Sequence, residues 1–312
     1  MRKLPMLLLI FFALFLVFDF VVIPNTIVVE RTVVITAKKE ALYRLMVKDN
    51  QWLKSIDSTR ADMNSPEFSY HSKQYKITYK TIASIIIQLK NKDSALTTSL
   101  SFIPHEPDST YLLWQTSLAS GTNPITRFKN YLLSRSIGND FSSILQRLKN
   151  YVPNNDDVYG IKVEKMEVND SILVASSSNV KSFPTISYIY GQFNKLRLYV
   201  QNNSGNITGP PMLNISTGDS INYLVRVALP VDKELAGTNE IKYKRMMNKG
   251  KILKVRVKGG YDAINKAYTS LVSYVNDYHF VSPAISFQSL ITDRSKVANP
   301  DEWITDIYYP VM

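Results

Sequence analysis

The sequence predicts an α+β protein of two domains behind one N-terminal transmembrane helix. Three observations lead to this prediction: an apolar run near the N-terminus, alternating strand patterns that end in a long amphipathic helix, and a helix pattern that recurs at a constant offset. The 312 residues are enough for two domains with cores of their own. The chain has no cysteine, which excludes disulfides and thiol chemistry.

The apolar run extends from Met6 to Ile23 and is interrupted only by Asp19. As an α-helix it would be roughly 27 Å long, which suffices to cross a hydrocarbon core, with Asp19 near one interface. We therefore expect residues 1–26 to form an uncleaved signal anchor; a cleaved signal peptide is the alternative. Arg2 and Lys3 favour a cytoplasmic N-terminus, although Arg31, Lys38 and Lys39 at the other end weaken this bias. We expect a bacterial inner-membrane protein whose domains are periplasmic.

Residues 27–152 are predicted to form the first domain. A Val- and Ile-rich strand opens it, a helix follows from Ala41 toward Trp52, and several alternating runs predict an antiparallel sheet with one buried face. A long helix with apolar residues at helical spacing, from Phe141 to Val152, closes it.

The segments "VVERTVVITAKKEALYRLMVKDNQWLKS" and "FSSILQRLKNYV" resemble the START-like, polyketide-cyclase-type (SRPBCC) superfamily. That resemblance implies a helix-grip fold, in which a sheet wraps a long helix and leaves an apolar cavity. Trp52, Tyr79 and Trp114 either line such a cavity or belong to an ordinary core, where large aromatic residues are common. A hydrolase or isomerase acting on a hydrophobic substrate in this cavity is the alternative to a binding function.

A polar linker that follows Pro153 separates a second domain, residues 158–312, which contains an internal repeat. One helical stripe recurs at an offset of 75: Ile189, Phe193, Leu196, Tyr199 and Val200 match Ile264, Tyr268, Leu271, Tyr274 and Val275. The repeat predicts a duplicated β-α-β-β unit, with two helices over one antiparallel sheet and a cleft between the copies.

The segments "KGGYDAINKAYTSLVSYV" and "FQSLITDRSKVANPDEWITDIYYPVM" resemble the gyrase-inhibitor-like (GyrI-like) effector-binding family, which follows the DNA-binding parts of some regulators. The resemblance implies binding of aromatic, often cationic compounds between aromatic faces and a buried carboxylate. Here Gln288 stands where the family has Glu, and Leu290 where it has Tyr. A glutamine neither neutralises a cation nor acts as a general base, so cation binding and hydrolysis are both in doubt.

We therefore predict a membrane-tethered protein that binds or senses a small hydrophobic or aromatic ligand and has no DNA-binding domain. The predicted ligand-binding residues are Gln288, Leu290, Trp303, Tyr308, Tyr261, Tyr268 and Tyr190. Core packing is the alternative role for the aromatic ones. The sequence shows no phosphate-binding loop, clustered metal ligands or acid–base pair, so we expect no cofactor, no metal, no catalytic residue and no nucleic-acid partner.

The net charge is +11, and eight basic residues with no acid lie between Lys242 and Lys258. Lys254, Arg256 and Lys258 alternate with valines, as on the solvent face of a strand. Contact with anionic lipid headgroups is the functional alternative.

Overall fold

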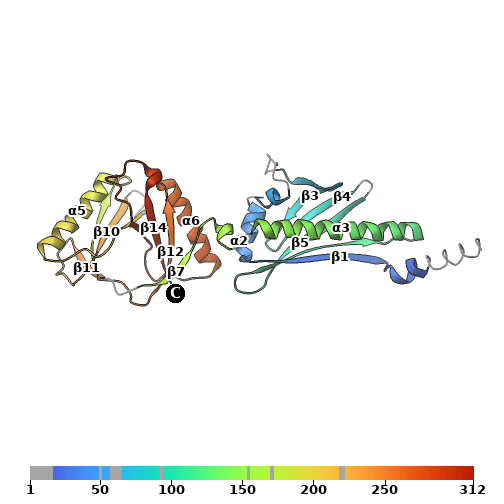
Figure 1. The fold of residues 1–312 in the computed structure, drawn as a ribbon, viewed down its shortest axis with the longest axis horizontal. Helices are drawn as coiled ribbons and strands as arrows, with labels where there is room; N and C mark the ends of the chain where they lie inside the picture. The colour runs from blue at the N-terminus through green and yellow to red at the C-terminus, as the bar shows by residue number, and fades with distance from the viewer. Residues whose placement is uncertain are drawn as a thin grey trace, which may run out of the picture. The chain divides into compact units, whose positions relative to one another are not determined.

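The computed structural model describes residues 17–48, 51–56, 65–91, 94–152, 155–168, 172–217 and 222–312. The chain divides into two compact units, Met1–Val158 and Tyr159–Met312 (Figure 1). The α+β class is confirmed, because each unit is built on one large antiparallel sheet. Most of the predicted membrane helix lies outside the described residues, and no helix within the described part is long and apolar enough to span a membrane.

The first unit has a six-stranded antiparallel sheet in the order β1-β6-β5-β4-β3-β2. Its strands are β1 (Thr26–Ile35), β2 (Glu67–Tyr70), β3 (Lys73–Lys80), β4 (Ser84–Asn91), β5 (Ser94–Pro104) and β6 (Thr110–Ala119). Three short helical segments connect β1 to β2: α2 (Lys39–Tyr43), η2 (Arg44–Lys48) and η3 (Gln51–Ser55).

The long helix α3 (Pro124–Tyr151) packs against β1 and β6 (Figure 1). It begins with Pro124 in its first turn, and the side chain of Asn123 accepts a hydrogen bond from the backbone of Thr126. Trp114 stacks on Phe141 of α3 with ring centroids 4.2 Å apart.

The aromatic residues considered for a cavity in this unit have different surroundings. Trp52 and Trp114 are fully buried in the core, whereas Tyr79 is 66% exposed and lines no interior space. The order of strand, helix, sheet and long helix is the predicted one, and membership of the START-like superfamily stays a prediction.

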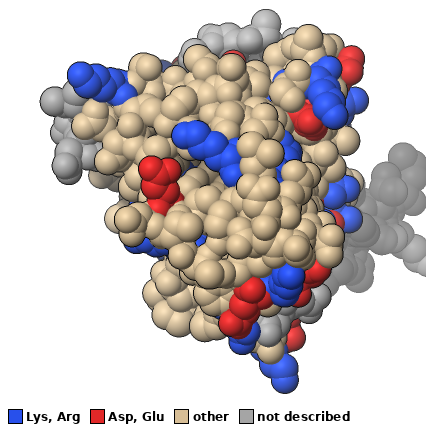
Figure 2. Space-filling view, turned by 90° about the vertical axis from the view of Figure 1, so that its left-hand side faces the viewer, with Lys and Arg blue, Asp and Glu red and all other residues tan. Residues whose placement is uncertain are grey.

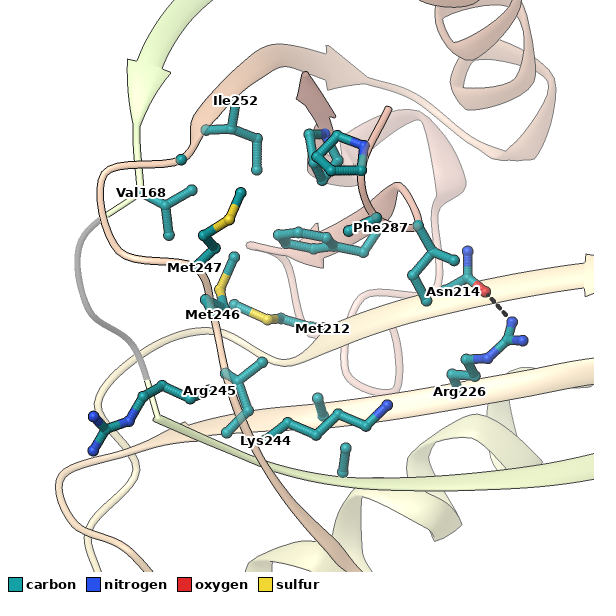
Figure 3. Close-up of a pocket in the computed structure, with 18 of the residues that line it drawn as sticks. Val168, Met212, Asn214, Arg226, Lys244, Arg245, Met246, Met247, Ile252 and Phe287 are labelled. Carbon is teal, nitrogen blue, oxygen red and sulfur yellow. Dashed lines mark hydrogen bonds between the residues drawn. The ribbon is translucent and has the colours of Figure 1, made fainter. Parts of the chain in front are cut away.

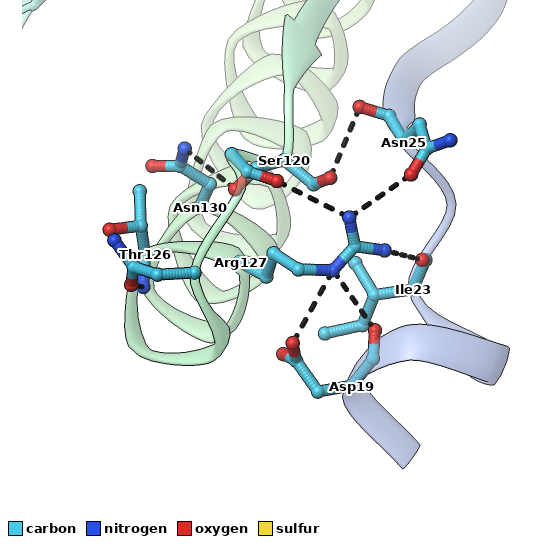
Figure 4. A network of polar contacts seen from close by, with 9 residues as sticks. Asp19, Ile23, Asn25, Ser120, Thr126, Arg127 and Asn130 are labelled. Atoms are coloured by element: carbon cyan, nitrogen blue, oxygen red, sulfur yellow. Dashed lines mark hydrogen bonds and ion pairs between the residues drawn. The ribbon is translucent and has the colours of Figure 1, made fainter. Parts of the chain in front are cut away.

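The segment before β1 is attached to the start of α3 through Arg127 (Figure 4). Its guanidinium forms an ion pair with Asp19 at 3.3 Å, and it also donates to the backbone oxygen of Ile23 and to the side chain of Asn25. Both charged residues are buried. Asp19 is therefore held by protein groups here, a role that its place in an apolar run did not predict.

The second unit consists of two copies of a β-β-α-β-β unit, preceded by the short helix α4 (Asn155–Tyr159). The first copy is β7 (Glu164–Glu167), β8 (Ile172–Val180), α5 (Ile186–Asn202), β9 (Met212–Thr217) and β10 (Tyr223–Val231). The second copy is β11 (Lys242–Arg245), β12 (Lys251–Lys258), α6 (Tyr261–Asp277), β13 (Phe287–Leu290) and β14 (Ile304–Val311). Both helices have 17 residues, and both their ends are offset by the predicted 75.

All eight strands form one antiparallel sheet in the order β11-β8-β10-β9-β13-β14-β12-β7. The copies meet where β9 pairs with β13. The two edge strands are exchanged: β7 of the first copy pairs with β12 of the second, and β11 of the second pairs with β8 of the first. The exchange ties the copies together at both edges.

Register separates the two faces of this sheet, because successive side chains of a strand point to opposite sides. Gln288 lies opposite Leu213 and Ile307, on the face that α5 and α6 cover, which we call the helix face. Phe287 lies opposite Tyr308 on the other side, which we call the open face.

Candidate functional site

The open face carries a cavity of about 400 Å³, which we call the Met-lined cavity (Figure 3). That volume is within the range of small-molecule sites. Its lining is mostly apolar and comes from both copies of the repeat, with Ala175, Met212 and Ala228 from the first and Phe287 and Pro310 from the second.

The turn between β11 and β12 covers one side of this cavity with Met246 and Met247. The backbone of Val168 holds the turn, since it donates to the oxygen of Gly250 at 2.8 Å and accepts from Lys249 at 2.9 Å. Met247 is largely exposed although it lines the cavity. Unbranched thioether side chains adapt to ligands of different shapes, so this turn suits an adjustable wall.

The charged residues that line the Met-lined cavity are all basic, as far as the structure describes its wall: Arg226, Lys244, Arg245 and Lys251. Arg226 donates to Asn214 Oδ1 at 2.8 Å (Figure 3). It also donates to Ser216 Oγ at 3.0 Å, and both partners are neutral. A neighbouring polar hollow of about 540 Å³ shares Arg226 and Lys244 and includes one acid, Glu240.

Positive charge is not gathered into a broad patch on the part of the surface that Figure 2 shows, where Lys and Arg are interspersed with Asp and Glu. Within the basic run, Arg256 forms two hydrogen bonds with Asp306, at 2.7 and 2.8 Å, and Lys254 pairs with Glu164 at 3.2 Å. The run is thus partly neutralised on β12, and its β11 end supplies the cavity rim.

A second cluster lies on the helix face and is centred on Arg294, which follows β13 and is only 4% exposed. Its Nη2 atom donates to Gln288 Oε1 at 3.2 Å and to Thr305 Oγ1 at 2.8 Å. Its backbone N–H donates to the Tyr190 hydroxyl of α5 at 2.6 Å. The cluster therefore joins both copies of the repeat.

Two aromatic rings face the Arg294 guanidinium. Its central carbon is 5.6 Å from the ring centroid of Tyr261 and 4.9 Å from that of Trp303, within the range of cation–π attraction. Burial lowers the pKa of Arg294, and the nearby phenols of Tyr261 and Tyr190 oppose that shift. Burial also raises the pKa of Tyr190, which keeps its hydroxyl protonated. We call Arg294 with Tyr190, Tyr261, Gln288 and Trp303 the arginine box.

The structure thus brings four of the seven predicted ligand-binding residues together around one arginine. The other three lie elsewhere. Leu290 is buried in the core under α5, Tyr268 is 39% exposed and its hydroxyl is 3.2 Å from that of Ser286, and Tyr308 is on the open face. Tyr308 stacks on Phe287 with ring centroids 5.1 Å apart.

Sequence reasoning did not find Arg294 or the methionines of the cavity. A methionine pair, Met246-Met247, inside a run of basic residues without acids was the available signal for the cavity rim. Arg294 carried no such signal, because it lies in an irregular segment between two strands.

The first unit contains a buried polar cluster that the enzyme alternative has to consider. Asp140 of α3 accepts hydrogen bonds from Lys73 Nζ at 2.5 Å and from the Tyr75 hydroxyl at 3.2 Å, and it lies 2.7 Å from His71 Nδ1. Burial and the neighbouring Asp140 raise the pKa of Tyr75, so its phenol remains a donor. Neither of the two hollows described above includes a residue of this cluster, and its groups satisfy one another. Among the described residues, no group of three His, Cys, Asp or Glu side chains is placed to hold a metal ion.

No family model matches the chain, and no curated protein matches its sequence. Solved structures that match part of the chain include the C-terminal domain of EcmrR, at 19% identity and a TM-score of 0.42, covering 49% of this chain and 98% of that one. A hydrolase from Listeria innocua matches at 11% identity and a TM-score of 0.38, covering 48% of this chain and 92% of that one.

SAV2435 bound to tetraphenylphosphonium matches at 14% identity and a TM-score of 0.33, covering 49% of this chain and 94% of that one. At these scores the three likenesses carry no conclusion about the ligand or the reaction of this chain.

Proposed function

We propose that the second unit is a binding module for a small amphiphile with an apolar body and an anionic end, held in the Met-lined cavity. The observation that carries this proposal is the combination of an apolar wall with a rim whose described charges are all positive. The family resemblance of the sequence supports a ligand-binding role, and the charge of the ligand comes from this chain's own residues.

An apolar ligand body gains free energy in such a cavity because it leaves water. The gain is about 0.8 kcal/mol for each methylene group that becomes buried. The described wall is mostly apolar, and the flexible side chains of Met212, Met246 and Met247 can repack around apolar ligands of different shapes. The cavity thus favours a class of apolar bodies over one specific compound.

The anionic end would be held at the rim by Arg226 and Lys244. The neutral partners of Arg226 orient its guanidinium and leave its charge uncompensated. A carboxylate or phosphate that accepts from it forms a charge-assisted hydrogen bond, which is stronger than a neutral one. Arg245 contributes less, because it pairs with Glu234 at 2.5 Å.

The binding module would be tethered to a membrane, where amphiphiles concentrate. The support is the apolar run from Met6 to Ile23, and Arg2 and Lys3 favour the periplasmic face of a bacterial inner membrane. Capture or sensing of such an amphiphile is the role that we propose.

Two measurements on the full chain test the binding function. Native mass spectrometry of the purified protein shows whether an amphiphile accompanies it. Fluorescence titration then compares dansyl-undecanoate with its uncharged alcohol analogue. We expect the acid to bind more tightly, and Ala228→Phe, which fills the cavity, to abolish binding of both.

The rim is tested with Arg226→Gln combined with Lys244→Gln. This variant should bind acid and alcohol equally, whereas Lys258→Gln, an exposed lysine that does not line the cavity, should keep the preference for the acid. Unchanged binding in Ala228→Phe would refute the site. Equal binding of acid and alcohol by the unmodified protein would refute the proposed preference for an anionic ligand.

A further inference from the structure

The arginine box leaves a buried cation without an anionic partner. Two of the three nitrogen atoms of the Arg294 guanidinium, Nε and Nη1, have no hydrogen-bond acceptor among the described residues, and no carboxylate there lies within ion-pair distance. The adjacent carboxylate of Asp293 accepts from Ser295 and lies 3.8 Å from Lys296. It is therefore engaged away from the guanidinium.

Unpaired buried charges are rare because removing a charge from water is costly unless hydrogen bonds and a counter-charge replace the water. The groups that do contact Arg294 are neutral: Gln288, Thr305 and the rings of Tyr261 and Trp303. They orient the guanidinium and do not neutralise it. The residue that decides this is Gln288, because a glutamate at that position would lie at ion-pair distance.

We propose that the arginine box is a second ligand site, which takes an aromatic carboxylate or a similar aryl anion. The anion would accept hydrogen bonds from Nε or Nη1 of Arg294, and the aryl ring would pack against Tyr261 and Trp303. This site lies on the helix face, so it is separate from the Met-lined cavity and does not depend on the function proposed for it.

The way in is covered by aromatic side chains. Phe183, in the segment between β8 and α5, is 46% exposed and meets the Tyr261 ring edge-on at 5.4 Å. Tyr261 in turn meets Trp303 edge-on at 5.6 Å. For a ligand to reach the guanidinium, the Phe183 and Tyr261 rings would have to rotate, and neither residue belongs to a strand. The same rings then form the walls for the aryl group of the ligand.

Calorimetric titration of the full chain with 2-naphthoate and with 2-naphthylmethylammonium tests whether the site prefers an anionic ligand to a cationic one. We expect the carboxylate to bind at least about tenfold more tightly than the ammonium, a difference of one decade in Kd. Arg294→Gln should remove that preference. Ala228→Phe should leave it unchanged, because Ala228 lines the cavity on the other face.

Gln288→Glu keeps the test decisive if Arg294→Gln fails to fold. Its carboxylate replaces an amide oxygen that lies 3.2 Å from Nη2 of Arg294, so the protein itself would supply the counter-charge of the guanidinium. We expect this variant to lose naphthoate while its thermal midpoint rises, which excludes unfolding as the cause. The double variant Gln288→Glu/Arg294→Gln should prefer the ammonium.

Several results would overturn the proposal. Naphthoate affinity that is unchanged in Arg294→Gln and Gln288→Glu would do so, as would equal binding of the two probes or no binding of naphthoate to the unmodified protein. Loss of naphthoate in Ala228→Phe alone would place the probe in the Met-lined cavity, and the arginine would then be satisfied by solvent only.

Discussion

Replacing Asp140 by Asn is expected to destabilise the first unit by about 3 kcal/mol, the lower end of the 3–5 kcal/mol range for breaking a buried ion pair. Lys73 and Asp140 are both almost fully buried, and Nζ lies 2.5 Å from Oδ2. The substitution keeps the size of the side chain and removes its charge, so the ammonium stays buried with only neutral acceptors. Ser136 Oγ, at 2.8 Å, remains one of them.

The loss is measured by urea unfolding, with hydrogen exchange of α3 peptides to assign the transition to the first unit. Urea slopes of small domains are about 1–3 kcal/mol per molar, so the midpoint should fall by about 1–3 M. The double variant Asp140→Asn/Lys73→Met should recover much of the loss, because it leaves no buried charge.

His71→Gln is the matched control for this prediction. His71 also contacts Asp140, at 2.7 Å, but its side chain is 66% exposed, so the pair is worth about 1 kcal/mol or less. A loss below about 1 kcal/mol in Asp140→Asn would refute the reasoning, because it would show that the burial of Lys73 carries no electrostatic penalty. A double variant less stable than Asp140→Asn would refute it as well.

Three further predictions concern other parts of the chain. Asp19→Asn should destabilise the first unit by about 1–3 kcal/mol in the same urea assay, because it removes the counter-charge of the buried Arg127 while Arg127 keeps several hydrogen-bond acceptors. No change would mean that this ion pair does not hold the N-terminal segment. Gly259→Ala should cost the second unit about 1–3 kcal/mol, because the residue has a φ of +132° and an added Cβ would meet the first turn of α6 at 2.8 Å; an unchanged melting curve would contradict this. The pKa of Asp232 lies below its usual 3.8 because the backbone and side-chain amides of Asn206 donate hydrogen bonds to the carboxylate. The ionised carboxylate therefore contributes its full stabilisation above the unfolded-state pKa, and this stabilisation is lost as the pH falls through the lower folded-state pKa. An NMR titration should show this pKa rising in Asn206→Ala, which removes the side-chain donor and keeps the backbone N–H donor. An unchanged value would exclude the side-chain amide as a contributor.

Local periodicity explains why the helices of the second unit were predicted well. Apolar residues at spacings of three and four define α5 and α6 independently of any distant contact, so their offset of 75 is visible in the sequence. The exchanged edge strand β7 (Glu164–Glu167) was not predictable in this way. All four of its residues are exposed, so it has no apolar pattern, and its pairing with β12 is a non-local contact.

The candidate site was predictable where family resemblance and strand alternation agree. The resemblance singled out Gln288, Tyr261 and Trp303, and the structure brings them together around Arg294; their role in ligand binding stays a prediction. Tyr308 was assigned to the same site, but a single step of register decides which face of a sheet a side chain occupies. Arg294 depends on the path of an irregular segment, for which the sequence has no periodic pattern.

The position of Gln288 has a different meaning once Arg294 is in view. From the sequence, a glutamine in place of the family's glutamate reads as a lost contact to a cationic ligand. In the structure, a glutamate there would form an ion pair with the guanidinium and would compete with an anionic ligand for it. The glutamine instead orients Arg294 and leaves its charge available, which is the condition that an anion-binding site requires. The positive rim of the Met-lined cavity has the same sign, so we infer that both faces of this sheet select against cations.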